Sequence, residues 1–128
     1  MKKLNLALIC ALILGLLSCK KDSESPTITV TQPTNHSNHT KGEMLHIEAT
    51  FEDDVELASY SIYIGDENGE HSSDFHYMSN DEISGKSYSL HKHTMIPDTI
   101  GMVYYLHINV TDASDKTTSE SIMLHFMW

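Results

Sequence analysis

Arginine is absent from this sequence, and basic residues of any kind are few. The 128 residues include 18 Asp and Glu but only 8 Lys, for a formal net charge of −10 at pH 7. An acidic surface repels nucleic-acid phosphates, and without arginine it lacks the side chain that grips a phosphate through two parallel hydrogen bonds. The composition therefore argues against nucleic acid as a partner.

Long hydrophobic runs are also scarce, and the one clear run lies at the N-terminus. Two lysines precede an apolar stretch that is too short for a comfortable membrane span. Residues 16–19 (LLSC) then resemble the bacterial lipobox, whose final cysteine becomes lipidated and forms the mature N-terminus. We therefore predict a lipoprotein signal peptide at residues 1–18 and lipid attachment at Cys19. An uncleaved anchor helix and a plain secretory signal are the alternatives.

Cysteine occurs only twice, at Cys10 and Cys19. Signal cleavage would remove the first, and lipid would occupy the second. A polar tether is predicted at residues 19–25 and a single folded domain at residues 26–128, which contain no cysteine. That domain can form no disulfide, thiolate metal site or cysteine nucleophile, so hydrophobic burial must hold it together.

Apolar and polar residues alternate through most of the remaining chain. Residues 104–110 are the clearest case, and we expect Leu106 and Ile108 to face the core while His107 faces solvent on the other side. The same period of two predicts strands at residues 28–30, 45–51, 60–64, 88–96 and 122–128. The expected core includes Ile47, Ile62, Leu106, Ile108 and Leu124.

Turn-forming residues separate these strands, and no convincing helical period follows the signal. Six or seven short strands in about a hundred residues favour an all-β, immunoglobulin-like or fibronectin-like antiparallel β-sandwich. An eight-stranded barrel is the alternative topology. The cysteine pair and core tryptophan of antibody domains are absent, so the relation would be to disulfide-free sandwiches.

Several segments together resemble one protein family. Residues 49–62 read ATFEDDVELASYSI, residues 91–93 read HKH, and residues 105–112 read YLHINVTD. The chain resembles the Bacteroidota lipoprotein family known as domain of unknown function 4625. The resemblance implies an immunoglobulin-like fold and an outer-membrane lipoprotein, on the periplasmic face or at the cell surface. It implies no particular activity.

No catalytic residues are predicted. The sequence has no G-x-S-x-G elbow, no glycine-rich phosphate loop, no H-E-x-x-H helix and no cysteine nucleophile in the domain. We therefore predict that the protein is not an enzyme. No cofactor is predicted with certainty, and Zn or Cu is the candidate. A membrane-anchored binding or interaction domain, with an unknown protein or glycan as its partner, is the first functional hypothesis.

Nine histidines are an unusual number for a domain of this size. Imidazole binds Zn and Cu readily, and two histidines at positions i and i+2 of a strand lie on one face, about 6–7 Å apart. His91 and His93 form such a pair, and His71 and His76 in a preceding loop are predicted to complete the site. A histidine-based Zn or Cu lipoprotein is therefore the alternative function.

Clustered acids predict a second kind of metal site. Residues 52–56 and 112–115 are acidic connections that lie at the same end of an immunoglobulin-like sandwich. Carboxylate oxygens suit Ca²⁺, although aspartate is also common in turns for conformational reasons. Asp53 and Asp54 are expected in an exposed turn.

Overall fold

The computed structural model describes residues 21–128, which form eight strands. Their bounds are β1 (Thr27–Gln32), β2 (Ser37–Thr40), β3 (Met44–Glu52), β4 (Leu57–Gly65), β5 (Met78–Glu82), β6 (Ser87–Met95), β7 (Val103–Asp112) and β8 (Thr117–Met127). In this part of the chain, no helix is long and apolar enough to cross a membrane. The predicted signal peptide and the lipid site at Cys19 lie outside the described residues.

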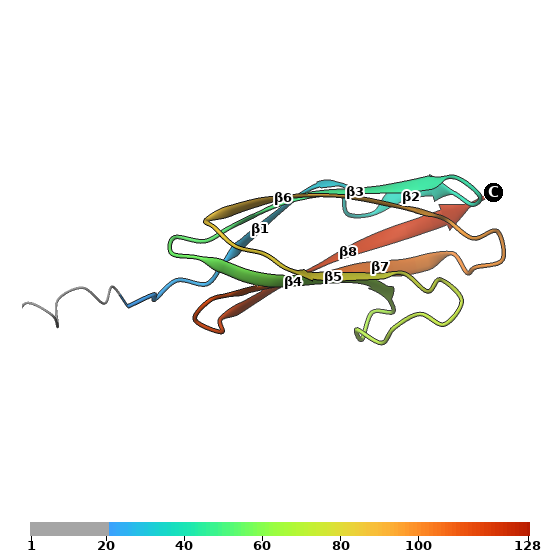
Figure 1. Cartoon of the computed structure of the whole chain (residues 1–128). Coiled ribbons are helices and arrows are strands. Elements are labelled where there is room, and N and C mark those ends of the chain that lie inside the picture. The colour runs from blue at the N-terminus through green and yellow to red at the C-terminus, as the bar shows by residue number, and fades with distance from the viewer. Residues whose placement is uncertain (1–20) are drawn as a thin grey trace, which may run out of the picture.

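The strands form two sheets that pack face to face (Figure 1). One sheet has three strands in the order β1-β3-β6, and the other has five in the order β2-β8-β7-β4-β5. All strand pairs are antiparallel except β2 and β8, which run parallel. The predicted all-β sandwich is confirmed, with eight strands rather than about seven.

Alternation along each strand explains the core. The five residues expected there, Ile47, Ile62, Leu106, Ile108 and Leu124, are each 0% exposed. The interior also holds aromatic side chains from both sheets, and Phe51 packs against Tyr60 with ring centroids 5.7 Å apart. Burial of these apolar surfaces supplies the stabilisation that a disulfide would otherwise add.

Two strands have no period-two pattern and were not predicted. β2 (SNHT) and β5 (MSNDE) are short and polar, and they form the two edges of the five-stranded sheet. Polar residues on short edge strands are common because they discourage pairing with other molecules. The expectation for the end of the last strand was also wrong, since β8 ends at Met127 and Trp128 is 84% exposed rather than part of the core face.

The pairing register fixes what lies at each end of the sandwich. Thr27 pairs with Glu52 and Glu52 pairs with Ser87, so the segment before β1 enters beside the connection from β3 to β4. Met44 pairs with Met95 at the opposite end of β3, about 27 Å away by strand rise. We call the first the tether end and the second the far end (Figure 1).

Candidate functional site

The predicted histidine pair on β6 faces outward as expected. His91 and His93 are exposed, whereas Leu90 beside them is 0% exposed. Both therefore lie on the outer face of the three-stranded sheet.

The two loop histidines lie elsewhere. His71 and His76 belong to the connection from β4 to β5, at the edge of the five-stranded sheet. The His71 ring stacks on Tyr63, an outward-facing residue of β4, with centroids 4.1 Å apart. The predicted four-histidine set is therefore not brought together, because its two pairs belong to opposite sheets of the sandwich.

The structure instead places two β3 residues beside the β6 pair. His46 is the direct cross-strand partner of His93, with ring centroids 6.3 Å apart. Glu48 is the partner of His91, and a carboxylate oxygen of Glu48 lies 3.8 Å from His91 Nδ1. We call the four residues His46, Glu48, His91 and His93 the histidine grid. The sequence places His46 on an outer face, but it does not reveal which strand lies beside it.

The acidic connections do meet at the tether end, as predicted. The backbone amide of Ala113 donates to the carbonyl oxygen of Glu56 at 2.9 Å, which holds the two turns together. The expectation that Asp53 is exposed was wrong, because only 8% of this residue is accessible. Its Oδ2 accepts hydrogen bonds from the amides of Val55 and Glu56 at 3.0 and 2.8 Å, which pulls the carboxylate inward.

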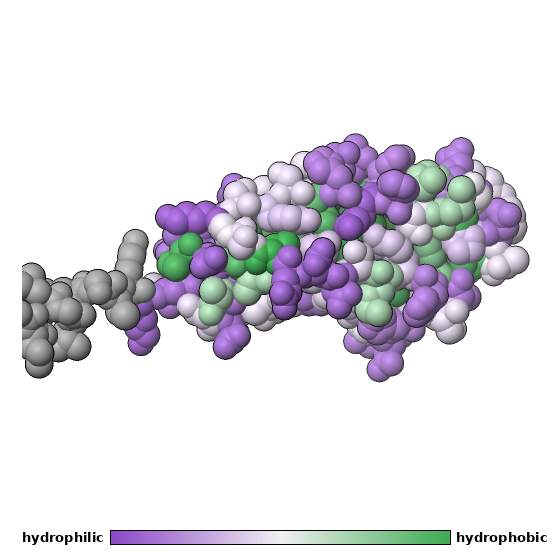
Figure 2. All heavy atoms as spheres, in the orientation of Figure 1, coloured by the Kyte–Doolittle hydropathy of each residue, from purple (hydrophilic) through white to green (hydrophobic). Residues whose placement is uncertain are grey.

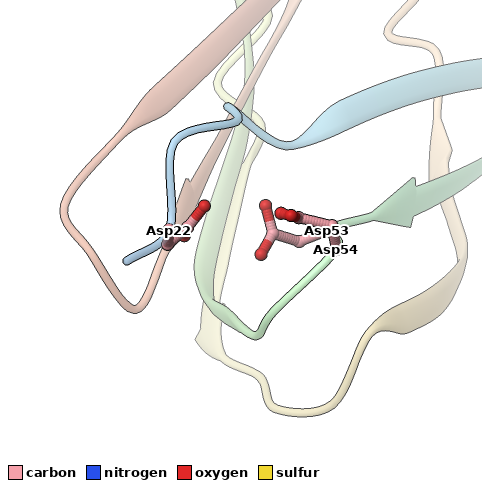
Figure 3. A group of neighbouring side chains, drawn as sticks. All are labelled: Asp22, Asp53 and Asp54. Carbon is pink, nitrogen blue, oxygen red and sulfur yellow. The ribbon is translucent and has the colours of Figure 1, made fainter. Parts of the chain in front are cut away.

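The sequence did not predict a role for Asp22. This residue precedes β1, and its carboxylate has an atom within 4.8 Å of ligand atoms of Asp53 and Asp54. Figure 3 shows the three side chains turned toward a shared space, with Asp22 arriving from a separate segment. We call them the three-aspartate cluster. No sequence motif connects these positions, because the contact exists only once the tether folds back against the β3–β4 turn.

Asp112 lies nearby but has other partners. Its Oδ1 accepts from the amides of Ser114 and Lys116, both at 2.9 Å, and so closes the β7–β8 turn. Its Oδ2 lies 3.2 Å from Lys116 Nζ, which also lies 3.1 Å from Asp22 Oδ2. Lys116 therefore links the tether to the β7–β8 turn.

His107 faces away from Leu106 as predicted, but it does not reach solvent. It is 8% exposed because the β4–β5 connection covers it and the Tyr63 ring stacks beside it at 4.9 Å. Hydrogen bonds hold the β4–β5 connection at two places. His107 Nε2 lies 2.8 Å from the carbonyl oxygen of Asp66, and Asp74 accepts a hydrogen bond of 2.7 Å from the Tyr104 hydroxyl of β7.

Exposed large apolar side chains gather at the far end of the sandwich. β3 and β7 start at this end, and β6 and β8 end there. The exposed members are Met44, Met95, Met102, Val103, Met127 and Trp128, which we call the methionine-rich end. Lys41 Nζ lies 4.4 Å from the Trp128 ring centroid. In Figure 2, pale green residues appear among polar ones toward this end, away from the grey trace.

Comparison with known proteins identifies the family. The model of the family described as "Domain of unknown function (DUF4625)" matches residues 17–127. The chain belongs to this family. The resemblance seen in the sequence is thus confirmed for most of the chain, and DUF4625 membership brings no described activity with it.

A solved structure supports the fold of this DUF4625 protein. The fibronectin(III)-like modules of CbhA from Clostridium thermocellum are similar, with a TM-score of 0.50 and 17% sequence identity over 80% of this chain and 46% of that one. The chain thus spans less than half of that structure's length, and the likeness concerns the fold alone. No curated protein matches this sequence.

Proposed function

We propose that this DUF4625 protein is a non-catalytic interaction module, held at the outer membrane by lipid on Cys19. The observation that supports this function is the opposite placement of the tether and the methionine-rich end. A chain attached through residues before β1 presents its far end to the surroundings. The fibronectin-like sandwich and the DUF4625 family are compatible with a binding role.

The chemistry of the methionine-rich end favours a protein partner with an apolar surface. Methionine side chains are flexible and polarisable, and they adapt to partner surfaces of irregular shape. Tryptophan is enriched among the residues that contribute most to protein interfaces, and Trp128 is 84% exposed. Exposed apolar groups gathered at one end are less common on a soluble monomer than single scattered ones.

Site-specific photo-cross-linking in the native organism tests this function. A photoreactive residue at position 95 or 128 should capture the same partner protein, whereas one at Ser119, near the tether end of β8, should not. With the purified partner, Met95→Glu and Met127→Glu should weaken binding to the full-length protein at least tenfold, while Ser119→Glu should leave it unchanged. An adduct with a second copy of this chain would show that the methionine-rich end serves self-association instead, and binding insensitive to both glutamates would rule it out as a docking surface.

A second candidate function is transition-metal binding at the histidine grid. His46, His91 and His93 provide imidazole nitrogens on one outer face, and Glu48 adds a carboxylate. Zn²⁺ takes nitrogen and oxygen ligands in a four-coordinate site, and Cu also binds imidazole well. Among the described residues, only the three aspartates bring three such ligand atoms within 4.8 Å of one another, so the side chains of the histidine grid would have to turn toward a shared ion. This set replaces the predicted loop histidines, His71 and His76, with residues that are direct cross-strand neighbours of the β6 pair.

A further inference from the structure

The three-aspartate cluster joins two segments that are distant in the sequence. Asp22 comes from the tether, and Asp53 and Asp54 come from the β3–β4 turn. One ligand atom from each lies within 4.8 Å of the other two. The Asp22 side chain is only 3% exposed, and Asp53 is 8% exposed, so two of the three carboxylates are shielded from water.

Asp53 provides an independent observation that points to a ligand at this place. Its Oδ2 accepts the two amide hydrogen bonds of the turn, but its Oδ1 is buried and has no hydrogen-bond partner. Buried polar atoms are almost always satisfied, because leaving one unpaired loses the hydration it had in the unfolded chain. The turn thus accounts for one oxygen of Asp53 and leaves the other without a hydrogen-bond partner. Figure 3 shows the Asp53 side chain pointing toward the space that Asp22 and Asp54 also face.

The charges around the cluster are not balanced by the contacts of the described residues. Lys116 lies between Asp22 and Asp112 and must serve both. Asp22 Oδ1 also accepts a hydrogen bond of 3.2 Å from the Glu24 amide. Glu24 and Glu52 add further negative charge to the adjoining hollow, where Lys86 is the basic residue.

We propose that the three-aspartate cluster is a Ca²⁺ site that fastens the tether to the end of the sandwich. All its ligand atoms are carboxylate oxygens, which a hard cation prefers. Ca²⁺ accepts six to eight oxygens in irregular geometry. The hollow beside the cluster is lined by Glu24, Ser25 and Glu52, which are residues with oxygen-bearing side chains that would add to the set. Transition metals that require imidazole or thiolate have no such ligands here.

The bound ion would connect the anchor to the domain. Asp22 follows the predicted lipid site, Cys19, by three positions, so an ion shared with Asp53 and Asp54 would restrict how the domain swings about its attachment. Lys116 already links the tether to the β7–β8 turn, and Ca²⁺ would link it to the β3–β4 turn. This proposal depends on neither a docking partner nor lipid attachment.

Calorimetry on the full-length chain in detergent tests the site. Titration with CaCl₂ should show one ion per chain, with a dissociation constant of about 10⁻⁴ to 10⁻³ M, as for extracellular modules. Asp22→Asn and Asp54→Asn should each weaken binding at least tenfold, while Asp81→Asn on β5 should not. Asp53→Asn would also weaken the hydrogen bonds from the amides of Val55 and Glu56 that close the turn, so its effect on Ca²⁺ binding is less direct. Absence of Ca²⁺ binding, or equal binding by all variants, would overturn the proposal.

Proteolysis provides a second readout that reports the tether itself. Lys21 is exposed next to Asp22, and endoproteinase Lys-C should cleave after it when the tether is free. At a Ca²⁺ concentration ten times the dissociation constant, the unbound fraction falls about elevenfold, and the cleavage rate should fall in proportion. Asp54→Asn should lose this protection. Equal cleavage rates in Ca²⁺ and in chelator, despite measured binding, would show that the ion does not hold the tether.

Discussion

His107 donates its Nε2–H to the carbonyl oxygen of Asp66, with 2.8 Å between the two heavy atoms. The other ring nitrogen, Nδ1, forms a hydrogen bond of 2.7 Å with the Ser121 hydroxyl, so both ring nitrogens have a partner. A strand of the five-stranded sheet thereby holds the start of the β4–β5 connection against its outer face. His107 therefore faces outward from the core but serves to hold this connection in place.

Replacing His107 should therefore cost more than an ordinary surface change. His107→Ala removes two hydrogen bonds and the stacking with Tyr63, and we expect a loss of about 1–3 kcal/mol in the free energy of unfolding. Urea denaturation measures this. The matched control is His91→Ala, an exposed strand histidine, which should change stability by less than about 0.5 kcal/mol. Equal effects of the two changes would mean that the connection does not depend on His107.

Asp74 predicts a specific acid dependence. The hydrogen bond from Ser72 is the largest cause, and together with the one from Tyr104 it holds the pKa of this carboxyl below its usual value. Burial acts in the opposite direction but has a smaller effect. A folded-state pKa below the unfolded value stabilises the protein above about pH 4 and loses that contribution as pH falls through the folded value. Asp74→Asn should cost about 1 kcal/mol at pH 7, since the residue is exposed, and clearly less at pH 3. A cost that does not change with pH would contradict this.

The histidine grid predicts a response to metal. A bound ion stabilises the folded chain by mass action, by about 4 kcal/mol at a thousandfold excess over its dissociation constant. Zn²⁺ or Cu²⁺ should therefore raise the melting temperature at pH 7, and the gain should fade near pH 5 as imidazole becomes protonated. A His46→Ala/His93→Ala double variant should lose the gain, whereas His71→Ala/His76→Ala should retain it. A flat thermal response in the wild-type chain would remove the metal hypothesis.

The anchor prediction concerns Cys19. Cys19→Ala should abolish incorporation of a fatty-acid probe in metabolic labelling and release the domain from membranes or leave its signal uncleaved. The matched control is Cys10→Ala, which lies within the predicted signal and should be processed normally. Undiminished labelling of Cys19→Ala would show that another position carries the lipid.

Residues that alternate along one strand could be assigned to the core from the sequence alone. Leu106 and Ile108 are buried and His107 points the opposite way, because successive side chains of a strand must leave opposite sides of the backbone. The turn-forming residues between such segments then indicated a sandwich. The edge strands β2 and β5 escaped prediction because neither carries a buried apolar face.

The local pattern of this sequence was thus sufficient to determine its fold class and the inward or outward face of each long strand, and its resemblance to known sequences indicated the family. Only the tertiary structure decided which outward residues are neighbours. His46 lies opposite His93, His107 lies under a connection, and Asp22 lies beside Asp53. The physical reason is that a side chain's face depends on backbone geometry over two residues, whereas strand pairing and loop contacts depend on the free energy of the whole folded chain.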